Sequence, residues 1–383
     1  MPWQNESPMD QKEKFIRDTQ RDAFTMPELC ERYGISRKTG YKWLGRFQEE
    51  GWAGLKERSR APQTCPHRID EVVAKAICDA RRKHPTWGAR KILDWMSEKY
   101  PRMALPAQST AHDLLKRNGL IKKRRRRFKG YVHPGVVPDD TTGPNDIWAA
   151  DFKGQFKTKD GIYCYPLTIT DVHSRYIISI KGLLSTRAEG AFQGFDRAFR
   201  EFGLPKAIRT DNGVPFATVA IHGLSHLNVW WIRLGIQHQR ILPASPQQNG
   251  KHERMHRTMK AEATRPARAN LNAQQREFNR FRKEYNEERP HEAIGGKTPS
   301  KLYRPSKRIY TGKIEPYEYP AHFVIKKVTS GGTIRLGPKL VFLANSLPGE
   351  IIGLEEVADG IWSIYLCNVL LARIDQRDYI LHP

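Results

Sequence analysis

"DIWAADFKGQF", residues 146–156, places an acidic residue inside an apolar segment that is typical of a β-strand. Asp151 follows Trp148, Ala149 and Ala150, and a charge within a strand costs free energy unless it is paired or bound to metal. The stretch therefore predicts a strand that carries a functional acid. A buried carboxylate that only accepts hydrogen bonds is the alternative interpretation of Asp151.

The segments that follow predict a mixed sheet flanked by helices. Two strands form an expected hairpin, a helix follows, and strand, helix and strand then alternate. The expected elements are "YCYPLTITD" (163–171), "RYIISIKGL" (175–183), "RAEGAFQGFDRAFREFG" (187–203), "KAIRTDNG" (206–213), "LNVWWIRLG" (227–235) and "IQHQRIL" (236–242). This order indicates an α/β domain.

Two further acids stand out by their context. Asp211 ends a predicted strand in "RTDNG", and open α/β sheets bind ligands at the carboxyl ends of their strands. Glu253 lies in "NGKHERMHRTMKAE" (249–262), a helix-like stretch rich in bases. A helix so rich in bases suits a polyanion, whose phosphates a carboxylate would repel. An acid at this position therefore indicates a cation held between the carboxylate and a phosphate. The alternatives are turn chemistry for Asp211 and an i, i+4 pair of Glu253 with Arg257.

The N-terminal segment predicts a helix-turn-helix. "TMPELCERYG" (25–34) opens with a capping box and ends at a glycine, and the basic helix "ISRKTGYKWLGRFQEEG" (35–51) follows, with Gly40 allowing close packing. A helical hairpin with a solvated charged face is the alternative. The outward residues, expected to meet the major groove, are Arg37, Lys38, Tyr41 and Lys42.

A second helical unit and a basic run follow. "IDEVVAKAICDARRKH" (69–84), "PTWGARKILDWMSEKY" (85–100) and "STAHDLLKRNG" (109–119) predict another helix-turn-helix, the last helix with Ser109 as N-cap. From Lys116 to Lys129 the chain has nine bases and no acid. Such a run is expected to bind phosphates, with a nuclear-import tag as the alternative use. Its centre is Arg124, Arg125, Arg126 and Arg127.

The last segment, about 320–383, alternates short apolar strands with Gly-containing turns. Asp359-Gly360 is a strong hairpin signal. We expect these strands to form a small β-barrel.

Composition points to nucleic acid as the partner. The 383 residues include 65 Lys and Arg against 41 Asp and Glu, a formal net charge of +24. Such an excess is tolerated best beside a polyanion, with an anionic membrane surface as the alternative. The five cysteines form no CxxC pair, which argues against a disulfide framework. Zinc binding by Cys65, His67, Cys78 and His84 matches no ligand pattern.

Three motifs in order resemble a known family. "DFKG" (151–154), "RTDNG" (209–213) and "SPQQNGKHER" (245–254) resemble the acidic motifs of DDE transposases with a retroviral-integrase-type (rve) catalytic core. "WGARKIL" (87–93) and "YNEERPHEAIGGKTPSKLY" (285–303) are similar to segments that flank this core in bacterial insertion-sequence transposases. The spacing before Glu253 is longer than in retroviral integrases, which predicts an insertion around "VAIHGLSHLNVWW" (219–231).

The resemblance implies an RNase H-like core in which Asp151, Asp211 and Glu253 bind two Mg²⁺ or Mn²⁺ ions. Water attack would free a transposon 3′-OH, which would then attack target DNA. His256, Arg257 and Lys260 follow Glu253 by three, four and seven positions, so a helix would place them on its face beside the DNA phosphates. Asp171 is instead expected to start a turn, and the rival acid Glu262 lies outside the third motif.

The implied organisation is multidomain. The expected parts are a helix-turn-helix domain (1–58), a second, winged-helix-like helix-turn-helix domain (59–122), a basic linker (123–142), the RNase H-like core (143–305) and the small β-barrel (306–383). The expected partners are the transposon terminal inverted repeats, target DNA and a second copy of the chain in at least a dimer. The expected location is the bacterial cytoplasm, at the nucleoid.

Two other functions compete with transposition. A DNA-binding regulator with an inactive integrase-like core would use the same N-terminal modules, and the intact set of three acids argues against it. A plain nuclease of RNase H-like fold would not need two helix-turn-helix units and a basic linker.

Overall fold

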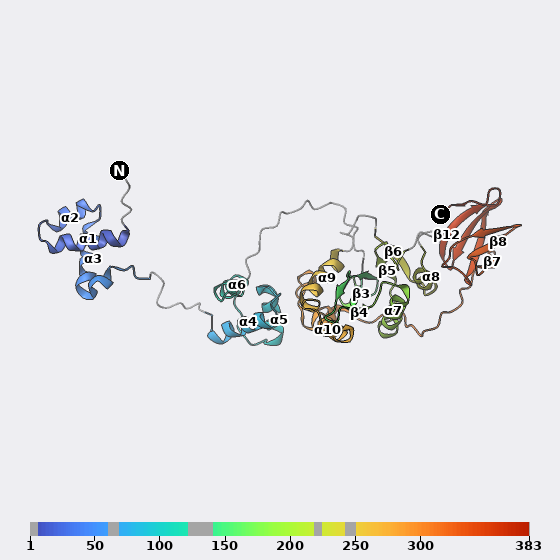
Figure 1. Ribbon diagram of the computed structural model, residues 1–383, viewed down its shortest axis with the longest axis horizontal. Helices are drawn as coiled ribbons and strands as arrows, with labels where there is room; N and C mark the ends of the chain where they lie inside the picture. The colour runs from blue at the N-terminus through green and yellow to red at the C-terminus, as the bar shows by residue number, and fades with distance from the viewer. Residues whose placement is uncertain (1–6, 60–68, 122–140, 218–223, 242–249, 383) are drawn as a thin grey trace. The chain divides into compact units, whose positions relative to one another are not determined.

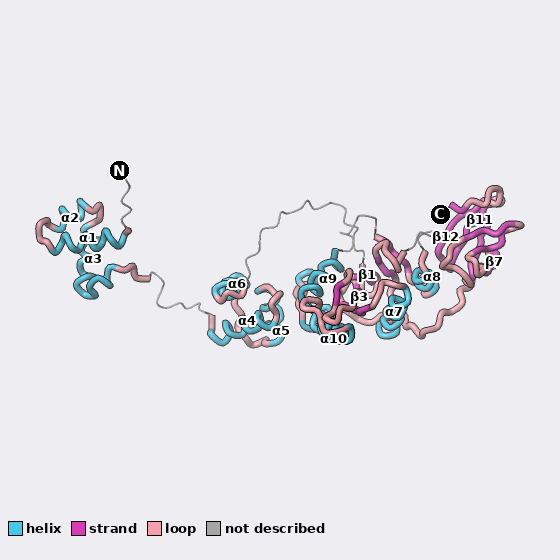
Figure 2. Tube along the Cα trace, in the orientation of Figure 1, coloured by secondary structure: helices cyan, strands magenta, loops and turns pink. Residues whose placement is uncertain are grey.

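The computed structural model describes residues 7–59, 69–121, 141–217, 224–241 and 250–382 (Figure 1). The chain divides into two compact units, residues 1–69 and 70–383, and each is described by itself. Figure 2 shows helices alone in the first unit and both helices and strands in the second. None of the helices in the described ranges combines the length and the apolar character that a bilayer crossing requires.

The first unit is helical, as the sequence predicts. It contains α1 (Pro8–Gln20), α2 (Met26–Arg32), α3 (Arg37–Glu50) and the 3₁₀ turn η1 (Gly51–Leu55). The capping box at the start of α2 is confirmed, and Ser36 caps α3 by accepting from the backbone N–H of Thr39. The sequence analysis did not foresee α1, which supplies Phe15 and Ile16 to the core.

Gly40 lets α3 approach α2 closely. A Cβ atom at this position would lie 2.6 Å from Sγ of Cys30, closer than real carbon and sulfur atoms approach. Trp43 is buried on the same side of α3, beside Leu29 and Cys30. The opposite side of α3 is therefore the one that faces solvent.

The second unit opens with three helices, α4 (Glu71–Lys83), α5 (Ala89–Lys99) and α6 (Gln108–Arg117). Asp70 caps α4 through its carboxylate, which accepts from the N–H of Val72. The prediction of Ser109 as the cap of α6 is wrong, because this helix begins at Gln108. His84 stacks on Trp87 and bonds Glu284, so it is engaged in packing rather than in a zinc site.

The central sheet has the predicted mixed topology. Its strands are β1 (Ile147–Phe152), β2 (Phe156–Lys157), β3 (Tyr163–Asp171), β4 (Ile177–Leu183), β5 (Ala207–Thr210) and β6 (Gln237–Arg240). The order is β2-β3-β1-β5-β6, and β4 pairs with the edge of β3 opposite to β1. β1 runs antiparallel to β3 and parallel to β5, so β1 is the point where the two halves of the sheet meet.

Helices cover both faces of this sheet (Figure 1). The aromatic residues of α7 (Ala188–Phe202) and α8 (His226–Arg233) pack with Trp148 and Ile208 on one face. The helices α9 (Gly250–Ala263) and α10 (Leu271–Lys283) cover the other face, where Met255 and Met259 meet Ile180. Successive side chains of a strand point to opposite faces of the sheet, so the strands of this sheet contribute apolar residues to a core on each face.

After α10 the chain runs through the π-helical turn η4 (Glu284–Glu288), the 3₁₀ turn η5 (Glu292–Ile294) and the short α11 (Pro299–Leu302). Asn286 in η4 bonds both backbone groups of Ile177, and Gln275 in α10 bonds the backbone of Ile180 and Gly182. These amides satisfy the open edge of β4, which would otherwise present unpaired backbone groups.

The C-terminal strands form two antiparallel sheets rather than the closed barrel that the sequence analysis expected. β7 (Val324–Lys327), β10 (Ile351–Ala358), β11 (Ile361–Leu366), β12 (Val369–Asp375) and β13 (Leu381–His382) make one sheet in the order β13-β12-β11-β10-β7. β8 (Thr333–Leu336) and β9 (Lys339–Phe342) make a separate hairpin. A barrel needs its edge strands to pair, and β7 and β13 each have one partner strand among the described residues. The turn at Asp359-Gly360 is as predicted.

Candidate active site on the central sheet

Asp151 lies near the end of β1, opposite Thr168 of β3. Burial raises the pKa of its carboxyl to about 7, and the negative charges of Asp211 and then Glu253 act in the same direction. Burial and like charge both disfavour the ionised form of an acid. Asp211 and Glu253 therefore both lie close enough to Asp151 to act on its carboxyl group.

The other two acids come from different elements. Asp211 directly follows β5, the parallel neighbour of β1, and its carboxylate accepts from the N–H of Gly213. Glu253 lies in the first turn of α9. Glu253 forms no ion pair with Arg257 within the described part of the chain, so the i, i+4 explanation of this acid is not supported.

The helix α9 has two chemically different faces. Its exposed side carries charged residues, and its other side is buried against the sheet. The exposed set is Glu253, Arg254, Arg257 and Lys260. The buried set is His252, Met255, His256, Met259 and Ala263.

Two threonines of β3 and two histidines of α9 form a buried hydrogen-bond network beside Asp151. The hydroxyl of Thr168 lies 2.7 Å from Nε2 of both His252 and His256, and it donates to the backbone carbonyl of Asp151 at 2.9 Å. The hydroxyl of Thr170 lies 2.7 Å from Nδ1 of His252. The network joins α9, β3 and β1 at the position of the candidate site.

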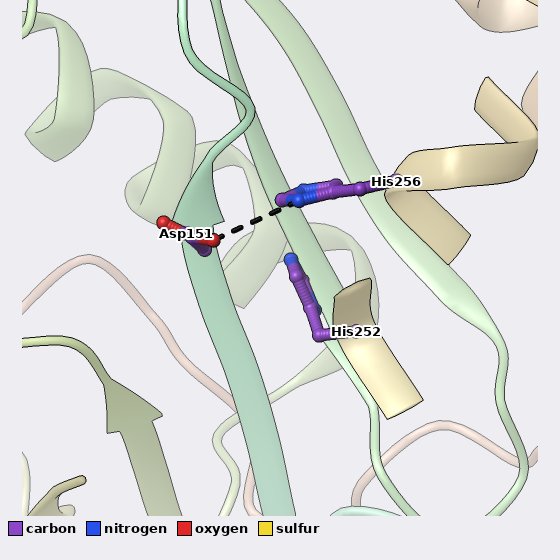
Figure 3. Close-up of side chains that lie close together, drawn as sticks. All are labelled: Asp151, His252 and His256. Carbon is purple, nitrogen blue, oxygen red and sulfur yellow. Dashed lines mark ion pairs between the residues drawn. The ribbon is translucent and has the colours of Figure 1, made fainter. Parts of the chain in front are cut away.

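Figure 3 shows the rings of His252 and His256 extending from α9 toward Asp151. Nδ1 of His256 lies 3.7 Å from Oδ2 of Asp151. Burial lowers the pKa of His252 to about 3 and lowers that of His256 further, with help from the neighbouring His252 and Lys153. Burial therefore favours the neutral form of both rings, and one nitrogen of each ring lies within 4.8 Å of the other and of a carboxylate oxygen of Asp151.

The expected phosphate contact of His256 does not fit this arrangement. His256 is 4% exposed and turns toward the sheet, whereas Arg257 and Lys260 are exposed as expected. The helical spacing correctly predicts that Arg257 and Lys260 share the exposed face of α9 with Glu253, and their contact with phosphates stays a prediction. The same spacing placed His256 on the wrong face because the apolar partners Met255 and Met259 draw that side of α9 into the core.

The rival acids have structural partners. Both carboxylate oxygens of Glu262 accept from Arg289, at 2.7 and 2.9 Å. Asp171 is buried and accepts from the backbone of Asn145 and Ser174. Both carboxylates therefore hold neighbouring parts of the fold together.

The expected DNA-contacting residues of the first unit, Arg37, Lys38, Tyr41 and Lys42, are all exposed on α3. Arg124, Arg125, Arg126 and Arg127 lie outside the described residues, as does most of the loop that precedes α9 and the first part of the expected insertion at 219–231.

Sequence reasoning missed the threonine and histidine network. A signal was present in "LTITD", where Thr168 and Thr170 alternate with apolar residues and so share one face of the strand. His252 and His256 are four positions apart and share one face of a helix. Only the packing of α9 on β3 shows that these two polar faces meet.

Comparison with known proteins agrees with the architecture. The Integrase core domain family matches residues 141–246, and a second Integrase core domain family matches residues 234–299. A Helix-turn-helix domain matches residues 11–63, and a Homeodomain-like domain matches residues 39–115.

Relatives come from insertion elements and retroviruses. The chain is 25% identical over 282 residues to an uncharacterized 39.2 kDa protein of insertion element IS476 from Xanthomonas euvesicatoria, covering 73% of this chain and 78% of the relative. It is 27% identical to a 31.7 kDa protein of insertion element IS407 from Burkholderia multivorans, covering 62% and 82%. The catalytic core domain of HTLV-2 integrase in complex with magnesium aligns at a TM-score of 0.35 with 19% identity, over 43% of this chain and 99% of that chain.

The domain matches follow the chain in the order in which the motifs predict them. A helix-turn-helix match and a homeodomain-like match precede two integrase core matches. The two insertion-element proteins align with this chain over 78% and 82% of their own length. Together these findings show that the chain contains matches to helix-turn-helix and integrase core domains and that it is similar to insertion-element proteins.

Proposed function

We propose that the chain cleaves the ends of its own insertion element and joins the freed 3′-OH groups to target DNA, with Asp151, Asp211 and Glu253 as the catalytic acids. The observation that carries this proposal is the pKa of Asp151, which burial and the charges of Asp211 and Glu253 raise to about 7. Asp151 is half-buried and is repelled by two acids from other elements, so its ionised form is unfavourable unless a cation neutralises it.

The residues fit a divalent cation by their donor chemistry. Carboxylate oxygens are the ligands that Mg²⁺ and Mn²⁺ prefer, and a cation would reverse the repulsion that Asp211 and Glu253 exert on Asp151. We propose two such ions per active site, held by these three residues. Bound cations of this kind supply Lewis acidity to the attacking hydroxyl and to the leaving 3′ oxygen.

The protein's own residues would position the DNA strand. Arg257 and Lys260 are exposed on α9 beside Glu253, where they can bind phosphates next to the scissile bond. The buried side of α9 fixes the orientation of Glu253 relative to β1 and β5. A rigid helix that carries both the acid and the phosphate-binding bases keeps their separation constant during the reaction.

We further propose that Arg37, Lys38, Tyr41 and Lys42 on α3 read the terminal inverted repeats in the major groove. Arg124 to Arg127 would neutralise phosphates, and replacing all four with alanine should lower the slope of log K against log salt by about 3.6, or about 0.9 per lost contact. An unchanged slope would mean that the run does not touch DNA. Two element ends joined at one site imply at least a dimer on DNA.

The test is a cleavage and joining assay with labelled DNA that carries the inverted repeats flanking the gene. Wild type with Mg²⁺ or Mn²⁺ should release 3′-OH ends and join them to a second duplex. Asp211→Asn should bind the labelled end but give no product. Asp196→Asn, which alters a partly exposed acid of α7 paired with Arg200, should behave as wild type. Binding without cleavage by wild type would instead favour a DNA-binding regulator with an inactive core.

A further inference from the structure

We propose that Nδ1 of His256 is a ligand of the divalent cation that Asp151 holds, so that one metal position has a mixed nitrogen and oxygen donor set. This inference rests on the proposed function for the presence of a cation at Asp151. It assigns a metal-binding role to a residue that lies outside the three acids.

The hydrogen bonds of Thr168 determine which nitrogen of His256 carries its proton. A hydroxyl has one hydrogen to donate and two lone pairs that accept. Thr168 contacts three partners, namely the carbonyl of Asp151, Nε2 of His252 and Nε2 of His256. The carbonyl can only accept, so the hydroxyl hydrogen goes to Asp151. Both imidazoles must then donate from Nε2.

His252 uses both of its ring nitrogens within the protein. It donates from Nε2 to Thr168, and its Nδ1 accepts from the hydroxyl of Thr170. This ring is therefore saturated, and its role is to hold α9 against β3.

His256 has the same tautomer with a different outcome. Its Nε2 donates to Thr168, so in the neutral ring the lone pair is on Nδ1, which lies 3.7 Å from Oδ2 of Asp151. Two acceptor atoms thus face each other beyond hydrogen-bond distance, an arrangement that gains energy only when a cation or a proton lies between them.

The separation suits a shared cation. Two atoms that each bind one ion at about 2.1 Å lie about 3 to 4 Å apart, depending on the angle between them. The ring is also preorganised, since Met255 and Met259 anchor the same side of α9 in the core. A metal-binding imidazole commonly donates its second nitrogen to an oxygen acceptor, and Thr168 provides that acceptor here.

A nitrogen ligand changes which metal the site prefers. Imidazole suits transition metals, whereas Mg²⁺ takes oxygen ligands. We therefore expect wild type to bind Mn²⁺ at least about tenfold more tightly than Mg²⁺, and His256→Asn to lose about tenfold or more of its Mn²⁺ affinity, the scale of lost support at a metal site.

The experiment is pulsed electron paramagnetic resonance of Mn²⁺ bound to the full-length chain, which detects a directly bound nitrogen by its nuclear modulation. Wild type should show ¹⁴N modulation, and labelling histidine with ¹⁵N should change its frequency. His256→Asn should lose the modulation. The matched variant His252→Asn should keep it, because His252 has no free ring nitrogen. Asp151→Asn should bind little Mn²⁺ and serves as the blank.

Several results would overturn the inference. Wild type that binds Mn²⁺ without nitrogen modulation would show that Asp151 and His256 form only an ion pair. Wild type that binds no more Mn²⁺ than the Asp151→Asn blank would show that there is no cation for His256 to coordinate. Modulation that persists in a folded His256→Asn variant, checked by circular dichroism, would assign it to another histidine. If His256→Asn does not fold, a ¹⁵N-histidine signal of wild type that is lost in Asp151→Asn and kept in His252→Asn still decides the question.

The cleavage assay separates this inference from the proposed function. A wild type that cuts DNA but shows no nitrogen modulation retains the proposed function and loses the histidine ligand. A wild type with nitrogen modulation that cuts no DNA retains the mixed-donor metal site and loses the proposed reaction.

Discussion

The helices α3 and α9 are both rich in basic residues, yet they present different chemistry to solvent. In α3 the residues Arg37, Lys38 and Lys42 are exposed on one side, while Trp43 is buried on the other. In α9 an acid, Glu253, lies on the exposed side among arginines, and two of the polar residues, His252 and His256, are buried. The difference shows that a count of bases does not reveal what a helix does. The helix α3, which we propose reads DNA, keeps its charged residues outside, whereas α9, which we propose carries a catalytic acid, also buries two histidines.

The largest effect is expected from the exposed side of α9. Glu253→Gln should lower cleavage by at least about a hundredfold, the scale of removing one charge-stabilising group from a reacting site. Binding of the DNA end should remain near the wild-type level. The matched change Arg257→Gln should instead weaken binding and lower the salt slope by about 0.9. Equal loss of cleavage and binding in both variants would mean that α9 only binds DNA, which is the role proposed for α3.

The second effect concerns the pH dependence of stability. The pKa of Asp151 is about 7 in the folded chain and near 3.8 when unfolded, so between these values the folded state holds a proton that the unfolded state has released. Without divalent cations, the free energy of unfolding of wild type should therefore fall, relative to Asp151→Asn, as pH rises from about 4 to about 7. The difference is on the order of a few kcal/mol at most.

Thermal unfolding of both variants across this pH range measures the effect. At pH values above 7, adding Mn²⁺ should raise the unfolding temperature of wild type. It should leave that of Asp151→Asn nearly unchanged, because ligand binding stabilises only the state that binds. Parallel pH profiles of the two proteins would contradict a repelled acid at this position.

The third effect tests α3. Arg37→Ala or Lys42→Ala should cost about 1 to 3 kcal/mol of binding to the terminal repeat, if either residue contacts a base edge. Preference for the repeat over unrelated DNA should fall with it. Footprints on the terminal DNA are the measurement. A footprint that persists unchanged in a fragment that begins near residue 143 would move sequence recognition away from α3.

The smallest effect concerns the buried side of α9. Thr168→Val removes the hydroxyl and leaves buried polar groups without a partner, which costs about 1 to 3 kcal/mol. Thr168→Ser keeps the hydroxyl and should retain most of the stability. Arg254→Ala, on the exposed side, should change stability by no more than about 0.5 kcal/mol. Comparable unfolding midpoints for the valine and serine variants would remove the network from the forces that hold α9.

The sequence by itself determined the elements and the acids. The strands around Asp151 and Asp211, the helix of Glu253 and the capped helices of the first unit all follow from local rules, because apolar periodicity and capping residues act over a few positions. The helix α1 escaped this reasoning, since its mixed polar sequence gives only Phe15 and Ile16 to the core. The expected C-terminal barrel was wrong for a related reason: strand patterns predict strands, but not which edges pair.

Only the tertiary structure decided how Asp151 is surrounded. Thr168 and Thr170 come from β3, and His252 and His256 come from α9, more than eighty positions later in the chain. No local rule relates two such segments, because their hydrogen bonds form only after α9 packs its methionines on the sheet. The sequence could name the three acids that we propose as catalytic. His256 is buried beside Asp151 rather than exposed as a surface base, and this follows only from the assembled core. The cost of removing polar and charged groups from water determines which face of α9 is buried and favours the neutral form of a buried ring.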